Sequence, residues 1–307
     1  MKQSPDIQNK FTFSGHETFH CRHLWLKKGY DFVSKGRKFS DEDAVVSLGV
    51  GKNMVSSIAF WLKAFGIINK EGELTAFAKY IFDPETGRDP YLEDEASLWL
   101  LHYELVTQNI ATTYNLIFNE FRREKIEFTK EQYIAFVIRK AAELNLSQIN
   151  KNTVAADFEV LTKLYLRSDA QSKDKEDTFS GLLTDLGLIQ EEKRRVNDRL
   201  ETFFHVKSGE KSEIPEEVIL YAILDSESFD KSISLRTIEQ ERFHAGSVFA
   251  IDRVGLHRKV EHIASNSKFS KYGIVFNDHA GIKELQFKEI PNKFKILDLY
   301  YDKESEL

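Results

Sequence analysis

Three histidines close to the N-terminus have the spacing of ligands on one face of a helix. His16, His20 and His23 fall at i, i+4 and i+7, so a helix would direct all three imidazole rings to the same side. Imidazole is a common metal ligand, but a metal site also needs ligands from another segment of the chain. Because the sequence marks out no partnering carboxylate, a metal site is the less favoured role. Packing or hydrogen bonding and contact with phosphates are the alternatives.

The helix that would position these rings has both a start signal and an end signal. Ser14 and Glu17 have the S-x-x-E spacing of a capping box, and Gly29 is a typical helix terminator. The pattern therefore predicts a helix over residues 14–28. A solvated basic helix face is one interpretation of it. The other is binding of DNA phosphates by its cationic side chains, which are His16, Arg22, Lys27 and Lys28.

Charge is distributed unevenly along the chain. The 307 residues have a formal net charge of −6, which by itself argues against a nucleic-acid partner. Residues 1–70, however, contain 11 Lys and Arg against 6 Asp and Glu, a net charge of +5. Residues 71–307 contain 32 against 43, a net charge of −11. The basic front of the chain therefore predicts an anionic ligand there.

The order helix, tight turn, helix is predicted within this basic front. One helix begins at residues 40–43 and ends at the glycines of residues 49–51, and the next runs from Asn53 to Gly66. Residues 67–75 are typical of a short hairpin, which would complete a winged helix-turn-helix. An ordinary helical hairpin and a winged helix that binds protein are the alternatives. The side chains expected to face a DNA groove are Lys52, Asn53, Ser56 and Ser57.

The glycines of this turn also resemble part of a phosphate-binding loop. The Walker pattern requires G-x-x-x-x-G-K-[ST], and residues 49–53 (GVGKN) match neither its spacing nor its final hydroxyl residue. We therefore exclude an NTPase and expect no nucleotide cofactor.

The rest of the chain divides into a helical part and a mixed part. Apolar periodicity predicts helices over residues 94–121, 129–144 and 152–164. The polar stretch at residues 168–177 is the best candidate for a domain boundary. Beyond it, strands are expected around residues 200–206, 248–251 and 272–276, with helices that open at Pro215 and span residues 253–264. The overall prediction is a mainly α protein with three regions, namely a winged-helix-like region at 1–90, a helical bundle at 91–170 and an α+β domain at 178–307.

The C-terminal third contains enough acids and histidines to suggest a metal-dependent nuclease centre. No nuclease signature accompanies them, and a charged solvent face predicts the same residue types. Catalysis there is the less favoured interpretation. The residues concerned are His244, Asp252, Arg253, His257, Glu261, His262, Asp278 and His279.

The cysteine content and the lack of long apolar runs indicate the cellular setting. Cys21 is its one cysteine, so an internal disulfide and a cysteine-based zinc cluster are both excluded. No run of about 18 apolar residues occurs, and the N-terminus lacks the apolar stretch of a secretory signal. We expect a cytoplasmic protein that does not cross a membrane.

Several of these segments together are similar to one bacterial family. The motifs that carry the resemblance are residues 13–19 (FSGHETF), Arg22, residues 25–30 (WLKKGY) and residues 48–55 (LGVGKNMV), with further support from residues 61–66 and 183–189. The chain resembles, over nearly its whole length, the SspB-type subunits of DNA phosphorothioation systems, a family catalogued as a domain of unknown function. The motifs at the N-terminus are specific, and the C-terminal half matches less clearly.

The resemblance implies a DNA-acting component of a modification and anti-phage defence system, in which SspB-like proteins are associated with DNA nicking before sulfur insertion. The family motif includes His16, Glu17 and Arg22 but not His20 or His23. If the protein nicks DNA, His16 and Glu17 are the first candidates for a general base or for contact with Mg²⁺ or Mn²⁺. Arg22 and Lys28 would then contact the phosphate.

The partners expected on this interpretation are DNA and the sulfur-transfer and ATPase proteins of the same system, with a homodimer as a further expectation. The sequence shows no nucleotide-binding loop and no reactive cysteine pair, so those chemical steps would belong to other proteins. Two alternatives remain open, a non-catalytic DNA-binding adaptor and a winged-helix transcriptional regulator.

Overall fold

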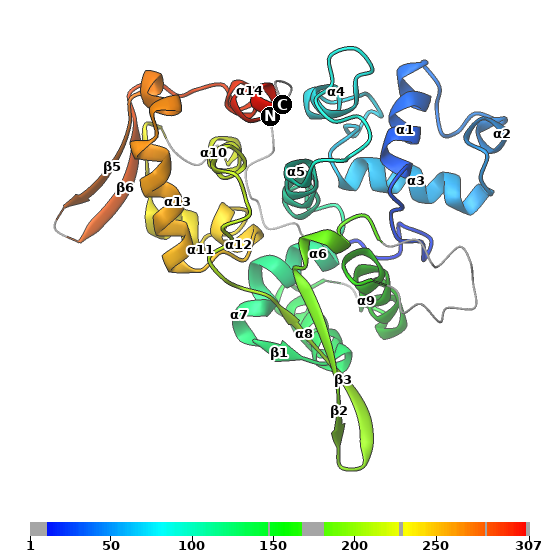
Figure 1. Cartoon of the computed structure of the whole chain (residues 1–307). Coiled ribbons are helices and arrows are strands. Elements are labelled where there is room, and N and C mark those ends of the chain that lie inside the picture. The colour runs from blue at the N-terminus through cyan, green and yellow to red at the C-terminus, as the bar shows by residue number, and fades with distance from the viewer. Residues whose placement is uncertain (1–10, 147, 168–180, 227–229, 280, 305–307) are drawn as a thin grey trace. The chain divides into compact units, whose positions relative to one another are not determined.

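A computed structural model describes residues 11–146, 148–167, 181–226, 230–279 and 281–304 of the chain (Figure 1). Two compact units are present, Met1–Lys207 and Ser208–Leu307, and each is described by itself. The boundary expected at residues 168–177 lies outside the described residues. The protein is mainly α, as the sequence predicts, with one small three-stranded sheet in each unit.

The first unit consists of helices with a sheet of order β1-β3-β2. Its α-helices are α1 (Trp25–Ser34), α2 (Ala44–Leu48), α3 (Lys52–Ala64), α4 (Ala76–Phe82), α5 (Glu95–Thr107), α6 (Thr112–Leu116), α7 (Arg122–Glu124), α8 (Lys130–Glu143) and α9 (Lys151–Tyr165). A π-helix, η1 (Ile117–Phe121), joins α6 to α7, and η2 (Thr184–Leu186) is a 3₁₀ turn. The strands are β1 (Glu127–Phe128), β2 (Ile189–Val196) and β3 (Arg199–Val206).

The helix predicted over residues 14–28 is wrong in both of its bounds. Helix α1 begins only at Trp25 and continues through Gly29 to Ser34. Ser14, Glu17 and Thr18 have φ values of 63°, 50° and 68°, a left-handed conformation that excludes an α-helix. Gly29 lies inside α1 because α3 is very close there: a Cβ at this position would lie 2.5 Å from Leu62 Cδ1. Close packing, and not helix termination, is what requires this glycine.

The predicted pair of helices around the glycine turn is confirmed as α2 and α3. Gly49 ends α2 in the left-handed conformation, with a φ of 62°, and the N-cap of α3 is Gly51. The expected wing is reduced to one bridge between Ile68 and Leu74. It is short because Thr75 immediately caps α4, its hydroxyl accepting a hydrogen bond from Ala78 N. A winged helix-turn-helix is therefore not formed in full.

The core of the first unit forms around α5, whose residues 96–106 are all buried. Helix α8 starts with the predicted cap, a capping box of Thr129 and Gln132. The small sheet joins this core through aromatic rings: Phe204 of β3 lies 5.0 Å from Phe158 of α9 between ring centroids. The same unit thus combines a helical core with a strand pair attached at one end.

The second unit, Ser208–Leu307, combines helices with a small sheet, and it begins 30 residues after the start of the α+β domain expected at 178–307. Its helices are α10 (Glu216–Asp225), α11 (Leu235–Gln240), α12 (Ala245–Val248), α13 (Arg253–Ser265), the 3₁₀ helix η3 (Ser267–Tyr272) and α14 (Lys293–Glu304). Its sheet has the order β4-β6-β5, all antiparallel, with β4 (Ser232–Ser234), β5 (Ile274–His279) and β6 (Ile282–Phe287).

Most of the expected elements of this unit are confirmed, including the helix after Pro215 and the helix at residues 253–264. The strand expected at residues 248–251 is wrong. Val248 ends α12 instead, and Ala250 has a φ of 53°. Only Ile251 pairs as a strand residue would, in a single parallel bridge to Gly209. A short apolar run does not distinguish a strand from a buried helix end.

Candidate nucleic-acid interface

The N-terminal loop, residues 11–24, packs against the helices of the first unit without forming a helix itself. Ser14 N donates a 2.8 Å hydrogen bond to Asp157 Oδ1 on α9. Trp61 on α3 donates from Nε1 to Phe19 O at 3.0 Å. Thr12 N donates to Thr112 Oγ1 at 2.8 Å, at the start of α6. The loop therefore joins three helices that are far apart in the sequence.

His16 is the most buried polar side chain of this loop, with 1% of its surface exposed. Its ring stacks on Trp61 at 5.7 Å between centroids and meets Phe60 edge-on at the same distance. Nδ1 accepts a hydrogen bond from Thr18 N, which places the proton of the neutral ring on Nε2. Nε2 lies 3.3 Å from Asp157 Oδ1, an electrostatic contact whose angle is not that of a hydrogen bond. The ring thus has a clear positional role, and its catalytic role stays a prediction.

The other predicted residues of the loop differ from His16 in their surroundings. Glu17 is exposed, and the Arg22 guanidinium lies 5.4 Å from the Trp25 ring centroid. His20 is buried and His23 is exposed, so the three histidines do not share one face. Among the described residues, no group of three or more His, Cys, Asp or Glu could hold a metal ion.

Both lysines of α1 have partners within the protein. Lys27 forms an ion pair with Asp31 and lies 5.9 Å from the Tyr91 ring centroid. Lys28 donates a 3.1 Å hydrogen bond to Leu48 O, one of the carbonyls left open at the end of α2. Lys28 therefore connects α1 to α2, a role that its position in the sequence does not reveal.

Unlike the lysines of α1, the polar side chains on the outer side of helix α3 are exposed. Lys52, Ser56 and Lys63 are exposed and recur at helical spacing within about 40° of one another around the axis. We call these three residues the α3 strip. Asn53 lies beside the strip and is also exposed. Ser57, expected on this face, is instead fully buried, and its Oγ has no hydrogen-bond partner within the described chain.

The cations of this region differ in how far they are already neutralised. Arg37 pairs with Asp41 and Asp43, and hydrogen bonds from Lys38 N and Arg37 lower the pKa of Asp41. Within the described part of the chain, no carboxylate lies within ion-pair distance of four exposed lysines. These are Lys35, Lys38, Lys52 and Lys63. Their charges are available to an external anion.

In the second unit, the acids and histidines that suggested a nuclease centre occupy several separate places. Asp252 caps α13 by accepting from Gly255 N at 2.8 Å. His244 is buried before α12, where desolvation lowers its pKa. Arg253 is exposed, and the side chain of His279 lies outside the described residues. Among the side chains that the structure describes, these residues form no group of three His, Cys, Asp or Glu that could hold a metal ion.

A second group lies between α13 and the sheet. His257 Nδ1 is 3.2 Å from Glu261 Oε2, which confirms their i, i+4 contact, and His257 Nε2 is 2.9 Å from Lys283 Nζ. Lys283 Nζ is also 3.0 Å from Asp278 Oδ2. Each acid is thus already close to a cation or an imidazole.

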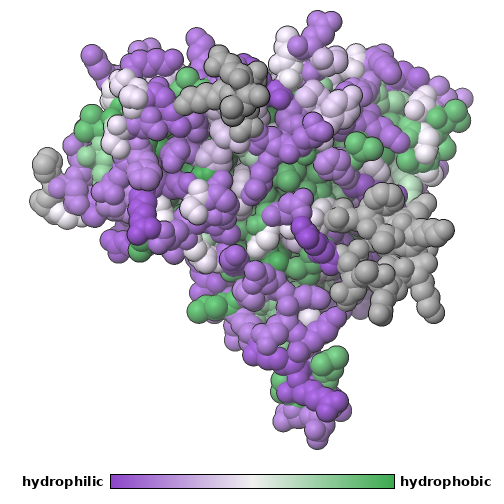
Figure 2. All heavy atoms as spheres, viewed as in Figure 1, coloured by the Kyte–Doolittle hydropathy of each residue, from purple (hydrophilic) through white to green (hydrophobic). Residues whose placement is uncertain are grey.

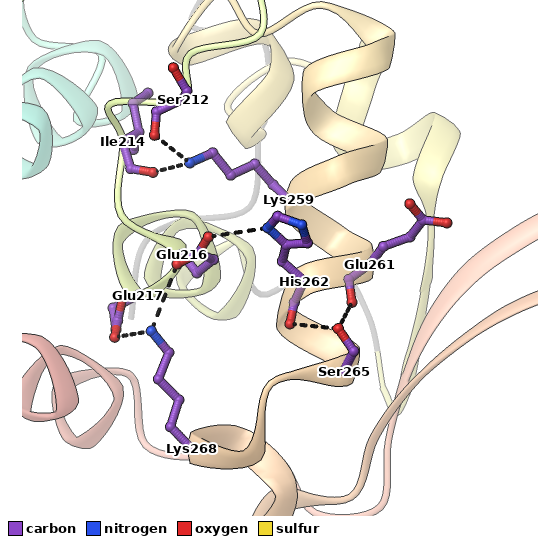
Figure 3. A network of polar contacts seen from close by, with 9 residues as sticks. All are labelled: Ser212, Ile214, Glu216, Glu217, Lys259, Glu261, His262, Ser265 and Lys268. Atoms are coloured by element: carbon purple, nitrogen blue, oxygen red, sulfur yellow. Dashed lines mark hydrogen bonds and ion pairs between the residues drawn. The ribbon is translucent and has the colours of Figure 1, made fainter.

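A third group surrounds the start of α10, where α13 and η3 supply the cations (Figure 3). Lys268 Nζ lies 2.6 Å from Glu217 Oε1 and 3.7 Å from Glu216 Oε2. His262 Nδ1 is 3.7 Å from Glu216 Oε1. The acids at the helix N-terminus are favourably placed with respect to the helix dipole, so a structural role accounts for them.

Lys259 belongs to the same network and is buried. Its Nζ donates to Ser212 O at 3.0 Å and to Ile214 O, and desolvation lowers its pKa. The ammonium thereby holds the segment that precedes α10 against α13, as Figure 3 shows.

Asp157 is a residue of the N-terminal site that the sequence does not single out. A signal for it exists, because Asp157 lies on the apolar face of α9 that Val154, Phe158 and Leu161 define. A carboxylate on a buried face requires a polar partner, and the backbone of the N-terminal loop provides it.

The fold thus defines a mainly α protein of two units, with an exposed polar helix face beside a glycine turn in the first. A family model described as "Protein of unknown function (DUF4007)" matches residues 13–301, and the chain belongs to this family.

Two solved structures are similar to the chain over most of its length. One, entitled "Magnesium ion-bound SspB crystal structure", has 29% sequence identity and a TM-score of 0.81. The other, "SspB crystal structure", has 28% identity and a TM-score of 0.80. Each alignment covers 95% of this chain and 88% of the other. The chain is therefore SspB-like. No curated protein matches it significantly.

A bilayer-spanning helix must be both long and apolar. Among the described residues, no helix combines the length and the apolar character needed to cross a membrane.

Proposed function

We propose that this protein is a DNA-binding component of a bacterial DNA phosphorothioation system. The observation that carries the proposal is the α3 strip, an exposed helix face with two lysines that have no carboxylate partner among the described residues. The similarity to the SspB structures supports the biological setting. Cationic side chains that neutralise phosphates release counterions from DNA, which is the main sequence-independent source of affinity.

The geometry of α3 favours contact with a phosphate at its start. Gly51 caps this helix without a side-chain hydrogen bond, so the first-turn N–H groups point outward with the positive end of the helix dipole. Lys52 is exposed at the same end. A helix N-terminus with an adjacent lysine is a suitable anion site. Asn53 and Ser56 could then donate to phosphates or base edges.

DNA nicking is the finer part of the proposal. Glu17 is its most accessible candidate, because it is exposed whereas His16 is buried. One of the similar structures is a magnesium-bound SspB by its title. The described residues of this chain do not form a group of three His, Cys, Asp or Glu side chains that could hold such an ion.

Binding is tested by fluorescence anisotropy with a 20-base-pair duplex across a salt series. We compare the wild type, Lys52→Ala/Lys63→Ala and a matched control, Arg236→Ala/Lys271→Ala, which removes two exposed cations of the second unit. The slope of log K against log salt should fall by about 0.9 for each phosphate that the α3 variant no longer neutralises. The control should leave the slope unchanged. Equal slopes for all three proteins would contradict a phosphate-binding role of the α3 strip.

Nicking is tested separately on supercoiled plasmid with Mg²⁺, with Mn²⁺ and with a chelator. Glu17→Gln is the sharper probe, since a change at His16 would also disturb the loop. Glu42→Gln removes another exposed acid of the same region and serves as the control. Metal-dependent open circles that disappear only in Glu17→Gln would support a nickase. Binding without nicking would instead favour the non-catalytic adaptor.

A further inference from the structure

The antiparallel pair β2–β3 extends well beyond the core of the first unit. Figure 1 shows these two strands projecting past α8 and β1. Only the base of the pair is buried, at Ile189, Phe204 and Val206. Strands of eight residues each span about 26 Å at about 3.3 Å per residue. An exposed strand pair of this length receives little stability from the core, so its outer part needs another explanation.

The outer part of this ribbon is well formed despite its exposure. Asn197 and Asp198 have φ values of 48° and 63°, as a two-residue type I′ turn requires. Arg194 braces the strands: its guanidinium lies 4.4 Å from the Phe203 ring centroid and pairs with Glu127 of β1. Arg194 is therefore already paired, and its contacts connect β2 to both β3 and β1.

The ribbon tip, residues 195–200, has two arginines without such partners. Arg195 and Arg199 are exposed, and no carboxylate of the described chain lies within ion-pair distance of either. Leu200, which faces Arg195 across the strands, is 68% exposed. Two acids of the ribbon, Glu191 and Glu192, lie closer to its base, where Lys193 and Arg194 contact them. The other two are Asp198 in the turn and Glu201, which pairs with Arg194 in the strand register. Figure 2 shows a mostly hydrophilic surface at this end, with a small apolar area.

The register places the two arginines of the tip on opposite faces of the ribbon. Arg199 pairs with Val196, and Arg195 belongs to the next pair, with Leu200. Successive cross-strand pairs point to opposite faces. A ribbon inserted tip-first between two rows of phosphates would therefore present one guanidinium to each row.

We infer that the β2–β3 ribbon enters the major groove of duplex DNA, with Arg195 and Arg199 on the phosphates of its two walls. The major groove is about 12 Å wide and about 8.5 Å deep and admits a two-stranded ribbon. The residues from Arg195 to the turn span about 10 Å at the usual rise, which matches this depth. Leu200 would lie beside Arg195, where an apolar group can contact a thymine methyl. The inference rests on the proposed DNA binding and adds a second point of attachment to the α3 strip.

The test uses the full chain and the same 20-base-pair duplex and salt series. The variants are Arg195→Ala/Arg199→Ala, the charge-conserving Arg195→Lys/Arg199→Lys, and the control Arg236→Ala/Lys271→Ala. With two fewer phosphates neutralised, the slope of log K against log salt should fall by about 1.8 in the alanine variant. Between 50 and 200 mM salt, the decrease in wild-type affinity should then exceed that of the alanine variant by about 12-fold. The lysine variant should retain the wild-type slope, and circular dichroism checks that each variant is folded.

The groove is tested with two small competitors, methyl green for the major groove and netropsin for the minor groove. Methyl green should reduce the DNA affinity of the wild type more than it reduces that of Arg195→Ala/Arg199→Ala. Netropsin should reduce the affinity of the two proteins by the same factor. A wild-type slope in the folded alanine variant would overturn the role of the ribbon while leaving the α3 strip intact. A larger difference between the two proteins with netropsin than with methyl green would overturn the assignment of the ribbon to the major groove. No binding by the wild type would refute the proposed function and this inference together.

Discussion

Replacing Asp157 by alanine is the most direct test of how the N-terminal loop is held. Asp157 is buried, accepts a 2.8 Å hydrogen bond from Ser14 N and lies 3.3 Å from His16 Nε2. Alanine removes the acceptor, so the Ser14 N–H loses its hydrogen-bond partner in a dry environment, and the electrostatic contact with His16 Nε2 is lost as well. An unsatisfied buried donor costs about 1–3 kcal/mol, and relief of the buried charge offsets part of this cost. We expect a net destabilisation of about 1–3 kcal/mol, chiefly from the Ser14 donor.

The measurement has a global and a local part. Urea unfolding gives the change in the free energy of unfolding of the first unit. Amide hydrogen exchange at Ser14 reports opening of the loop itself. Asp157→Asn retains an acceptor and should lose roughly half as much stability. Glu159→Ala is the matched control, because Glu159 is an exposed acid on the same helix whose ion pair with Lys130 contributes about 0–1 kcal/mol.

The reasoning fails if Asp157→Ala and Glu159→Ala unfold at the same urea concentration and the Ser14 amide exchanges at the wild-type rate. That result would mean that the ring contacts of His16 hold the loop without the carboxylate. Faster exchange in Asp157→Ala with unchanged global stability would instead show that the loop opens independently of the helices.

Three further predictions concern single side chains. Ser57→Ala should be neutral or stabilise the protein by up to about 1 kcal/mol in a urea titration, since the buried Oγ of Ser57 has no partner in the described chain; a destabilisation above about 1 kcal/mol would reveal a hydrogen bond. Lys28→Met should cost about 1 kcal/mol in the same titration, because the carbonyl of Leu48 loses its donor, and an unchanged midpoint would contradict this connection. Burial lowers the pKa of His244 below its ordinary 6.5, so the unfolded chain binds the proton first as pH falls. Stability of the second unit should therefore decrease as pH drops below about 6.5, less steeply in His244→Phe, and equal pH profiles would exclude His244 as the cause.

The motif in residues 13–19 combines structural side chains with accessible ones. Its His16 is enclosed by Phe60 and Trp61, and its backbone binds Asp157. The same loop leaves Glu17 exposed at the surface. One motif thus contains both a ring that packs in the interior and a carboxylate that is accessible at the surface.

The elements that the sequence alone predicted well are those with signals inside the element. The cap Thr129 with Gln132 starts α8 as expected, and the glycine turn separates α2 from α3. The basic front and the exposed position of Lys52 also follow from the sequence. Short-range hydrogen bonds and helical periodicity determine these features, so neighbouring residues are sufficient to predict them.

Tertiary structure decided the features whose partners are distant in the chain. Ser14 and Glu17 have a capping-box spacing, yet Ser14 N binds Asp157, 143 positions away, and no helix forms. Gly29 looks like a helix end and instead allows α1 to approach Leu62. In both cases a long-range interaction outweighs a local preference of about 1 kcal/mol. The burial of His16 and the exposure of the two arginines at the ribbon tip likewise depend on what the folded chain places beside them.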